Sequence, residues 1–96
     1  MWVQFRGYKN NNEMWSFING DRTICQIAKV DRGGFCFGDR SIIYRGTVWN
    51  KGYNGSEIIF DHDLDCLKLK CLIMCHAKGY KIESLVAHEE IRYNLD

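Results

Sequence analysis

Only one stretch of the chain has the residue pattern of a long helix, and this limits the fold more than any other feature. The stretch begins with three carboxylates, Asp61, Asp63 and Asp65, which suit the unpaired N–H groups and the positive dipole end at a helix start. Lys78 and Gly79 supply the matching stop. We therefore predict a helix over about 62–78, and no second helix of comparable length before it.

The residues before this helix alternate between short strands and polar turns. Asn19-Gly20 is the strongest hairpin signal, because both residues tolerate positive φ angles. Gly46 lies inside a strand pattern and suggests a bend or bulge there. The strands are expected over these ranges: 2–8, 14–18, 22–30, 41–49 and 56–60, with a further short one near 35–37.

These patterns predict one α+β domain over residues 1–96. At 96 residues the chain is long enough for one modest core and too short for two domains. We expect an antiparallel β-meander of about five or six strands packed against one helix. The tail, residues 80–96, fits either a short strand or a short helix, and the pattern leaves both open.

The predicted helix has two apolar faces. At about 100° per residue, one stripe faces the sheet and a second lies nearly opposite it. Either the tail or a second copy of the chain is expected to cover the second strip, which makes it our candidate homodimer interface. The sheet-facing stripe is Leu64, Leu67, Cys71, Met74 and Cys75, and the second strip is Cys66, Leu69, Ile73 and Ala77.

Composition predicts a cytoplasmic protein that does not enter a membrane. There is no 18-residue apolar run, and the first residues lack the basic and apolar regions of a secretory signal. The five cysteines are an odd number and three of them fall within the helix, so a disulfide framework is not expected.

No motif for catalysis, metal binding or cofactor binding is found, so we predict a protein that is not an enzyme and holds no metal or cofactor. His62 and Cys66 share one side of the helix and Cys71 and Cys75 another, about 180° away, so the two pairs cannot close one tetrahedral zinc site. The three aspartates have the first spacings of a calcium loop, but Cys66 stands where that loop needs glycine.

Aromatic residues give the strongest signal for binding. Three tryptophans, five tyrosines and five phenylalanines are more than a small core needs, and Trp, Tyr and Arg dominate interface hot spots. The predicted contact surface surrounds the loop after Trp49 and consists of Arg40, Arg45, Trp49, Lys51 and Tyr53. Nucleic-acid binding is kept as an alternative, in which aromatics stack on bases and one side of the sheet carries Arg6, Arg22, Arg32, Arg40 and Arg45. The other alternative is a protein that sequesters a small nucleotide signal.

The order of elements resembles that of small phage and mobile-element proteins. The β-meander that carries Trp15 and the Asn19-Gly20 and Gly33-Gly34 turns, followed by one acid-started helix, is similar to anti-CRISPR-type inhibitors of host defence. The resemblance implies a non-enzymatic protein, made in an infected bacterium, that blocks a host protein complex by direct contact or sequesters a signalling molecule. The net charge of +1 does not fit DNA mimicry, which needs an acidic surface.

Overall fold

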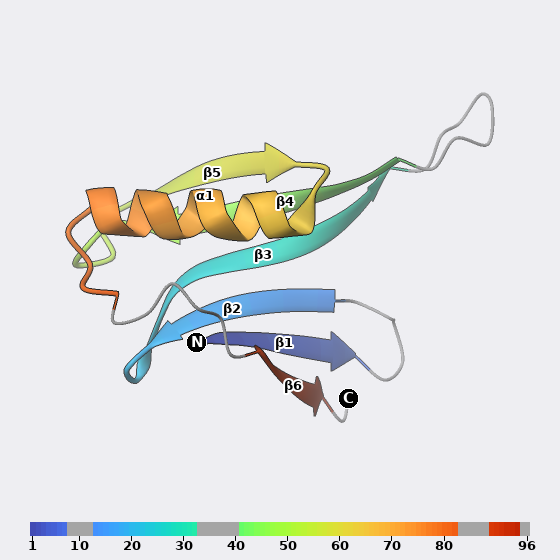
Figure 1. Cartoon of the computed structure of the whole chain (residues 1–96), viewed down its shortest axis with the longest axis horizontal. Coiled ribbons are helices and arrows are strands. Elements are labelled where there is room, and N and C mark those ends of the chain that lie inside the picture. Colours follow the sequence, from blue (N-terminus) through green and yellow to red (C-terminus); the bar gives the residue numbers. More distant parts are fainter. Residues whose placement is uncertain (8–12, 33–40, 83–88, 95–96) are drawn as a thin grey trace.

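A computed structural model describes residues 1–7, 13–32, 41–82 and 89–94. They form a sheet with one helix lying across it (Figure 1). The elements in chain order are β1 (Trp2–Gly7), β2 (Glu13–Asn19), β3 (Arg22–Arg32), β4 (Ser41–Trp49), β5 (Ser56–Asp61), α1 (Leu64–Ala77) and β6 (Glu89–Asn94).

The predicted α+β meander is confirmed. The strands β1 to β5 pair with their neighbours in sequence, all antiparallel, in the sheet order β5-β4-β3-β2-β1-β6. The open question about the tail is answered in part by β6, a strand that pairs with β1 in parallel. The expected strand near 35–37 lies outside the described residues.

The β2–β3 turn lies where the sequence predicts it, whereas the irregularity in the sheet lies elsewhere. Gly20 has a φ of 69°, a conformation that glycine adopts at little cost, and the β2–β3 hairpin turns there as predicted. The expected bulge at Gly46 is wrong: β4 pairs continuously through Gly46 with both neighbours, and the register instead shifts between Phe17 and Ile18.

The helix approaches the sheet closely at Gly46. A Cβ atom built on Gly46 would lie 2.7 Å from Cys71 Sγ and 3.3 Å from Leu67 Cδ1. A glycine within a strand marks either a bulge or the close approach of another element, and at Gly46 it allows the close approach of α1. The core lies between this face of the sheet and α1, and its buried members are Trp2, Trp15, Phe17, Ile24, Cys25, Ile27, Val48, Leu67, Cys71, Leu72 and Cys75.

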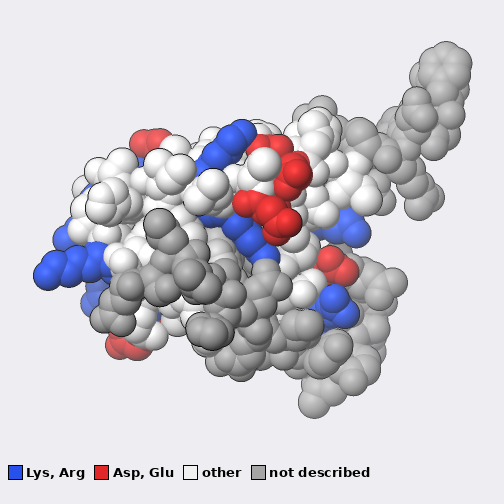
Figure 2. All heavy atoms as spheres, in the orientation of Figure 1, with Lys and Arg blue, Asp and Glu red and all other residues white. Residues whose placement is uncertain are grey.

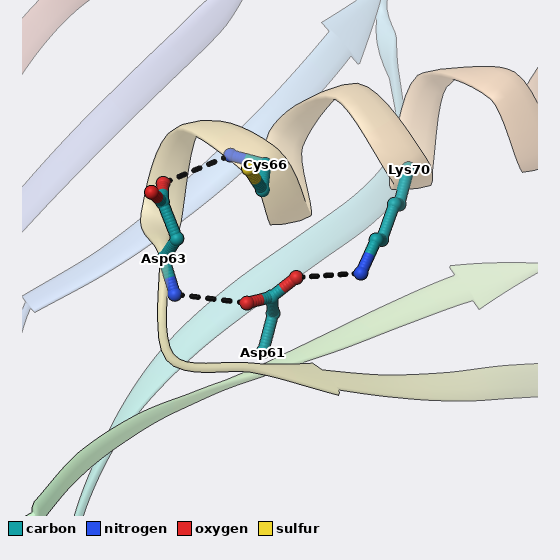
Figure 3. Close-up of polar contacts among 4 residues, drawn as sticks. All are labelled: Asp61, Asp63, Cys66 and Lys70. Atoms are coloured by element: carbon teal, nitrogen blue, oxygen red, sulfur yellow. Dashed lines mark hydrogen bonds and ion pairs between the residues drawn. The ribbon is translucent and has the colours of Figure 1, made fainter.

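The helix begins as the sequence predicts. Asp63 is the N-cap, and its carboxylate accepts a hydrogen bond of 3.1 Å from the Cys66 N–H (Figure 3). Asp61 Oδ1 accepts from the Asp63 N–H at 2.9 Å, while Oδ2 forms an ion pair of 2.7 Å with Lys70 Nζ. Two of the three carboxylates therefore organise the helix start.

The two apolar faces of α1 have different surroundings. Leu67, Cys71 and Cys75 of the first stripe are fully buried against the sheet. The second strip is exposed along its length, and Ile73 is 59% exposed. No described residue of the tail covers it, so the apolar strip is a surface feature of the single chain.

Candidate interaction surface

The face of the sheet opposite α1 is open at β5. Gly46 faces the helix, so its neighbours on β4, Arg45 and Thr47, face the other way, and their cross-strand partners Phe60 and Ile58 face with them. Arg45 is exposed, Phe60 is 52% exposed and Ile58 is 56% exposed. Two large apolar side chains and a guanidinium thus share one exposed area.

Burial changes steadily along this face. One row of cross-strand neighbours runs through all five antiparallel strands, from Val3 to Ser16, Gln26, Thr47 and Ile58. Val3 and Ser16 are buried, Gln26 and Thr47 are half-buried, and Ile58 is exposed. The open area is therefore confined to the β4–β5 end of the sheet, and we call Arg45, Thr47, Trp49, Ile58 and Phe60 the outer patch.

The structure brings together only two of the residues predicted for the contact surface. Arg45 and Trp49 lie on the same face of β4, four residues and about 13 Å apart. Lys51 lies instead near the end of α1, where its Nζ is 3.9 Å from a Cβ built on Gly79. Arg40 lies outside the described residues.

Tyr53 reaches across from the loop to β3. It adopts a φ of 59°, and its hydroxyl donates a hydrogen bond of 3.1 Å to the Thr23 carbonyl at the start of β3. The ring is 46% exposed, so it offers contact area beside the β4–β5 loop.

The loop between β4 and β5 is anchored to the end of α1. Lys78 Nζ donates to the Asn50 side-chain carbonyl and forms an ion pair of 3.2 Å with Glu57. The Tyr80 hydroxyl donates to the Trp49 carbonyl at 2.9 Å, and burial is the main cause that raises the Tyr80 pKa. These contacts hold Trp49 and the following loop in one position.

A groove runs between β5 and α1, on the helix side of the sheet. It has a volume of about 620 Å³, within the range of small-ligand sites. Its apolar lining is Ile59 from β5 and Ile73, Met74 and Ala77 from α1, and its charged lining is Glu57, Lys70 and Lys78. We call this the β5 groove.

The charges at the rim of the β5 groove are already paired. The N–H of Asp63 and the ammonium of Lys70 lower the pKa of Asp61, and Asp61 raises the pKa of Lys70 in return (Figure 3). Lys78 forms its ion pair with Glu57. An anionic ligand such as a nucleotide would have to displace a carboxylate from one of these lysines.

Three thiols meet in the core. Cys25 on β3 lies against Cys71 and Cys75 of α1, and all three are fully buried. Hydrogen bonds that the Cys25 thiol donates to Cys71 and then Cys75, together with burial, raise the pKa of Cys25, so its thiol stays neutral. Within the described ranges, no three His, Cys, Asp or Glu residues are arranged to hold a metal ion.

The arginines considered for nucleic-acid binding do not share one face. Arg6 is paired with Glu13, which lies two residues from Trp15 and so on the same face of β2. Trp15 is paired with Ile27 on the helix side of the sheet, so Arg6 faces the helix side as well. Arg45 faces the other side. An arginine surface that spans the sheet is thus divided between two faces.

Ile58 and Phe60 are the residues that sequence reasoning missed. The segment Ser56–Asp61 is apolar at 58, 59 and 60, so both faces of the strand carry apolar residues. Such a strand is expected to be covered on both sides. Within the described residues, α1 covers only the Ile59 side of β5. An apolar strand with a single helix to cover it was the sequence signal that could have identified Ile58 and Phe60.

Comparison with protein families, curated proteins and solved structures found no match to the chain. In the part of the chain that is described, no helix combines the length and the apolar character needed to cross a membrane. The function is therefore argued from the surface alone.

Proposed function

We propose that this protein is a non-enzymatic binding protein that docks onto a partner protein through the outer patch. The observation that carries the proposal is the exposure of Ile58 and Phe60 beside Arg45, on a part of the sheet that no described residue covers. Clustered exposed apolar residues on a small domain mark interaction sites. An arginine next to an aromatic ring is typical of the residues that contribute most to binding.

The resemblance to phage inhibitors of host defence suggests the kind of partner. In that hypothesis the partner is a component of a bacterial defence complex, and the protein acts by occupying its surface in a fixed stoichiometry. The patch is apolar with one cation, so it suits a partner surface with an apolar hollow and a neighbouring carboxylate.

Photo-cross-linking from the patch tests the proposal. A photoreactive phenylalanine analogue replaces Arg45, and the matched control carries the same analogue at Asp21, which is exposed in the β2–β3 turn. In a bacterial lysate we expect one discrete protein adduct from position 45 and none from position 21. Identical adducts from both positions, or none from position 45, would contradict docking by the outer patch.

The same experiment separates the two alternatives. An adduct that nuclease removes, and that falls steeply with salt, would support nucleic-acid binding. A bound small molecule seen by native mass spectrometry, with no protein adduct, would support the sequestering hypothesis. For that hypothesis the β5 groove is the candidate site.

A further inference from the structure

The outer edge of β5 is an open sheet edge without the usual protection. β5 is the last strand of the sheet, pairs with β4 without a register shift and contains neither proline nor lysine. Its two charged side chains, Glu57 and Asp61, lie near its ends, and each is paired with a lysine of its own chain. Among the described residues, no strand pairs with its other side. The unpaired N–H and C=O groups of such an edge are a template for another strand.

The β5 groove lies along this same edge. Ile59 lines it from the strand, and Ile73, Met74 and Ala77 line it from the helix. Ile73 is 59% exposed, whereas Leu69, from the same apolar strip, does not line the groove. An added strand at β5 would therefore lie next to apolar side chains on both faces, Ile59 and Ile73 on one and Ile58 and Phe60 on the other.

The charge distribution favours a second copy of the chain as the occupant. Acidic side chains gather over the start of α1, where Figure 2 shows basic side chains beside them, and further basic side chains follow its end. Asp61, Asp63 and Asp65 lie at the start, and Lys78 and Lys81 lie after the end. A two-fold axis that makes the strands antiparallel also makes the helices antiparallel, so each acidic end approaches a basic end.

We propose that two copies associate by antiparallel pairing of their β5 strands, in the register that places Ile59 opposite Ile59 of the second copy. On the outer face, this register places Ile58 of each copy opposite Phe60 of the other copy. Glu57 comes opposite the second Asp61, but each brings its own lysine, Lys78 or Lys70, so this four-charge cluster has no net charge.

The spacing of the elements allows the helices to contribute. Neighbouring strands lie about 4.8 Å apart, and α1 packs on β3, β4 and β5, with its close approach at Gly46 of β4. The two helix axes would then lie about 14 Å apart, wider than the roughly 8 to 10 Å of packed helices, so long side chains and not the helix backbones would meet between them. Ile73, Met74 and Ala77 of both copies would fill the space between the helices, where each single chain has its groove.

The dimer would also extend the outer patch. Pairing at β5 makes one continuous sheet, with Ile58 and Phe60 of both copies at its centre and Arg45 of each copy beside them. The inference itself goes beyond the proposed function, because it depends on the strand edge and the groove and needs no partner protein. Its test leaves Arg45 and Trp49 unchanged, so the two proposals can fail separately.

Mass measurements on the full chain test the proposal. A strip of this length gives a small interface, so light scattering should find mostly monomer at low micromolar concentration and close to twice the 11.3 kDa chain mass at high micromolar concentration. Ile73→Glu places a charge between the two helices, and Ile58→Lys removes the apolar pair that Ile58 makes with the second Phe60, so each should raise the dissociation constant about tenfold or more. The matched control is Ile42→Glu. Ile42 is 40% exposed and precedes the part of β4 that pairs with β5, so this change should leave the dissociation constant unchanged.

Cross-linking tests the register. With Cys36 and Cys66 changed to Ser, Ile59→Cys should form an intermolecular disulfide under mild oxidation, because directly opposite Cβ atoms lie about 4.5 to 5.5 Å apart. Ile58→Cys should not, because in this register it lies diagonal to its own copy, about 7 to 8 Å away.

A chain that stays monomeric at every concentration would overturn the proposal. So would a dimer that tolerates both Ile73→Glu and Ile58→Lys, with circular dichroism unchanged. Cross-linking through Ile58→Cys in preference to Ile59→Cys would overturn the register.

Discussion

Replacing Gly46 by alanine should destabilise the protein by forcing a methyl group between β4 and α1. The new Cβ would lie 2.7 Å from Cys71 Sγ, a distance that real Cβ atoms do not tolerate, and 3.3 Å from Leu67 Cδ1. Both residues are fully buried, so neither side chain can swing into solvent. Overpacking of this kind costs about 1 to 3 kcal/mol. Because Gly46 does not have a positive φ, removing glycine from a strand returns about 0.5 to 1 kcal/mol.

The expected net loss is therefore about 1 kcal/mol, and at most about 2.5 kcal/mol, in the free energy of unfolding. Urea unfolding followed by circular dichroism measures it, and each kcal/mol should lower Tm by about 4 to 8 °C in a domain of this size. Cys71→Ala removes the atom that clashes, so in the double variant the cost of Gly46→Ala should fall by about 1 kcal/mol or more. A Gly46→Ala protein as stable as the wild type, or strict additivity with Cys71→Ala, would refute the close approach of helix and sheet.

Three further perturbations follow from the contacts. The pKa of Asp61 is lowered by folding, so its contribution to stability is present above the unfolded value of 3.8 and is lost as pH falls below it. The Tm difference between wild type and Asp61→Asn should therefore vanish in acid, and a difference that persists at pH 2 would contradict this. Lys78→Met removes the contacts between the helix end and the β4–β5 loop, and should cost about 1 kcal/mol and speed hydrogen exchange in that loop alone. Cys71→Ser and Cys75→Ser each place a hydroxyl in the core and should cost about 1 to 3 kcal/mol without releasing metal, whereas stoichiometric zinc in the purified protein would contradict the core assignment.

The sequence predicted the elements well because their signals are local. A cap such as Asp63, a turn such as that at Gly20 and the alternation of a strand depend on neighbouring residues, so the chain reveals them directly. The role of Gly46 was not local. A glycine in a strand fits a bulge or a close approach equally well, and only the packing of Cys71 against it distinguishes the two.

The candidate surface was harder to predict because it depends on which residues are left without a cover. Arg45 and Trp49 were found from residue type, and strand alternation then places them on one face. Lys51 and Tyr53 were grouped with them by proximity in sequence, but the loop directs Lys51 toward Gly79 and Tyr53 toward Thr23. Sequence distance is a poor guide across a turn, where the chain changes direction at each residue.

The open face at β5 follows from how little a single helix can cover. A helix is about 10 Å across and strands lie about 4.8 Å apart, so α1 spans about two strands of a six-stranded sheet. It packs on β4, β5 and the adjoining part of β3 from one side. The other side of β5 carries Ile58 and Phe60. A strand face that is in contact with water normally carries polar residues at such positions. Because the described chain offers these two residues no cover, their cover is expected to come from another molecule, and the pairing edge next to them indicates where a second copy would begin.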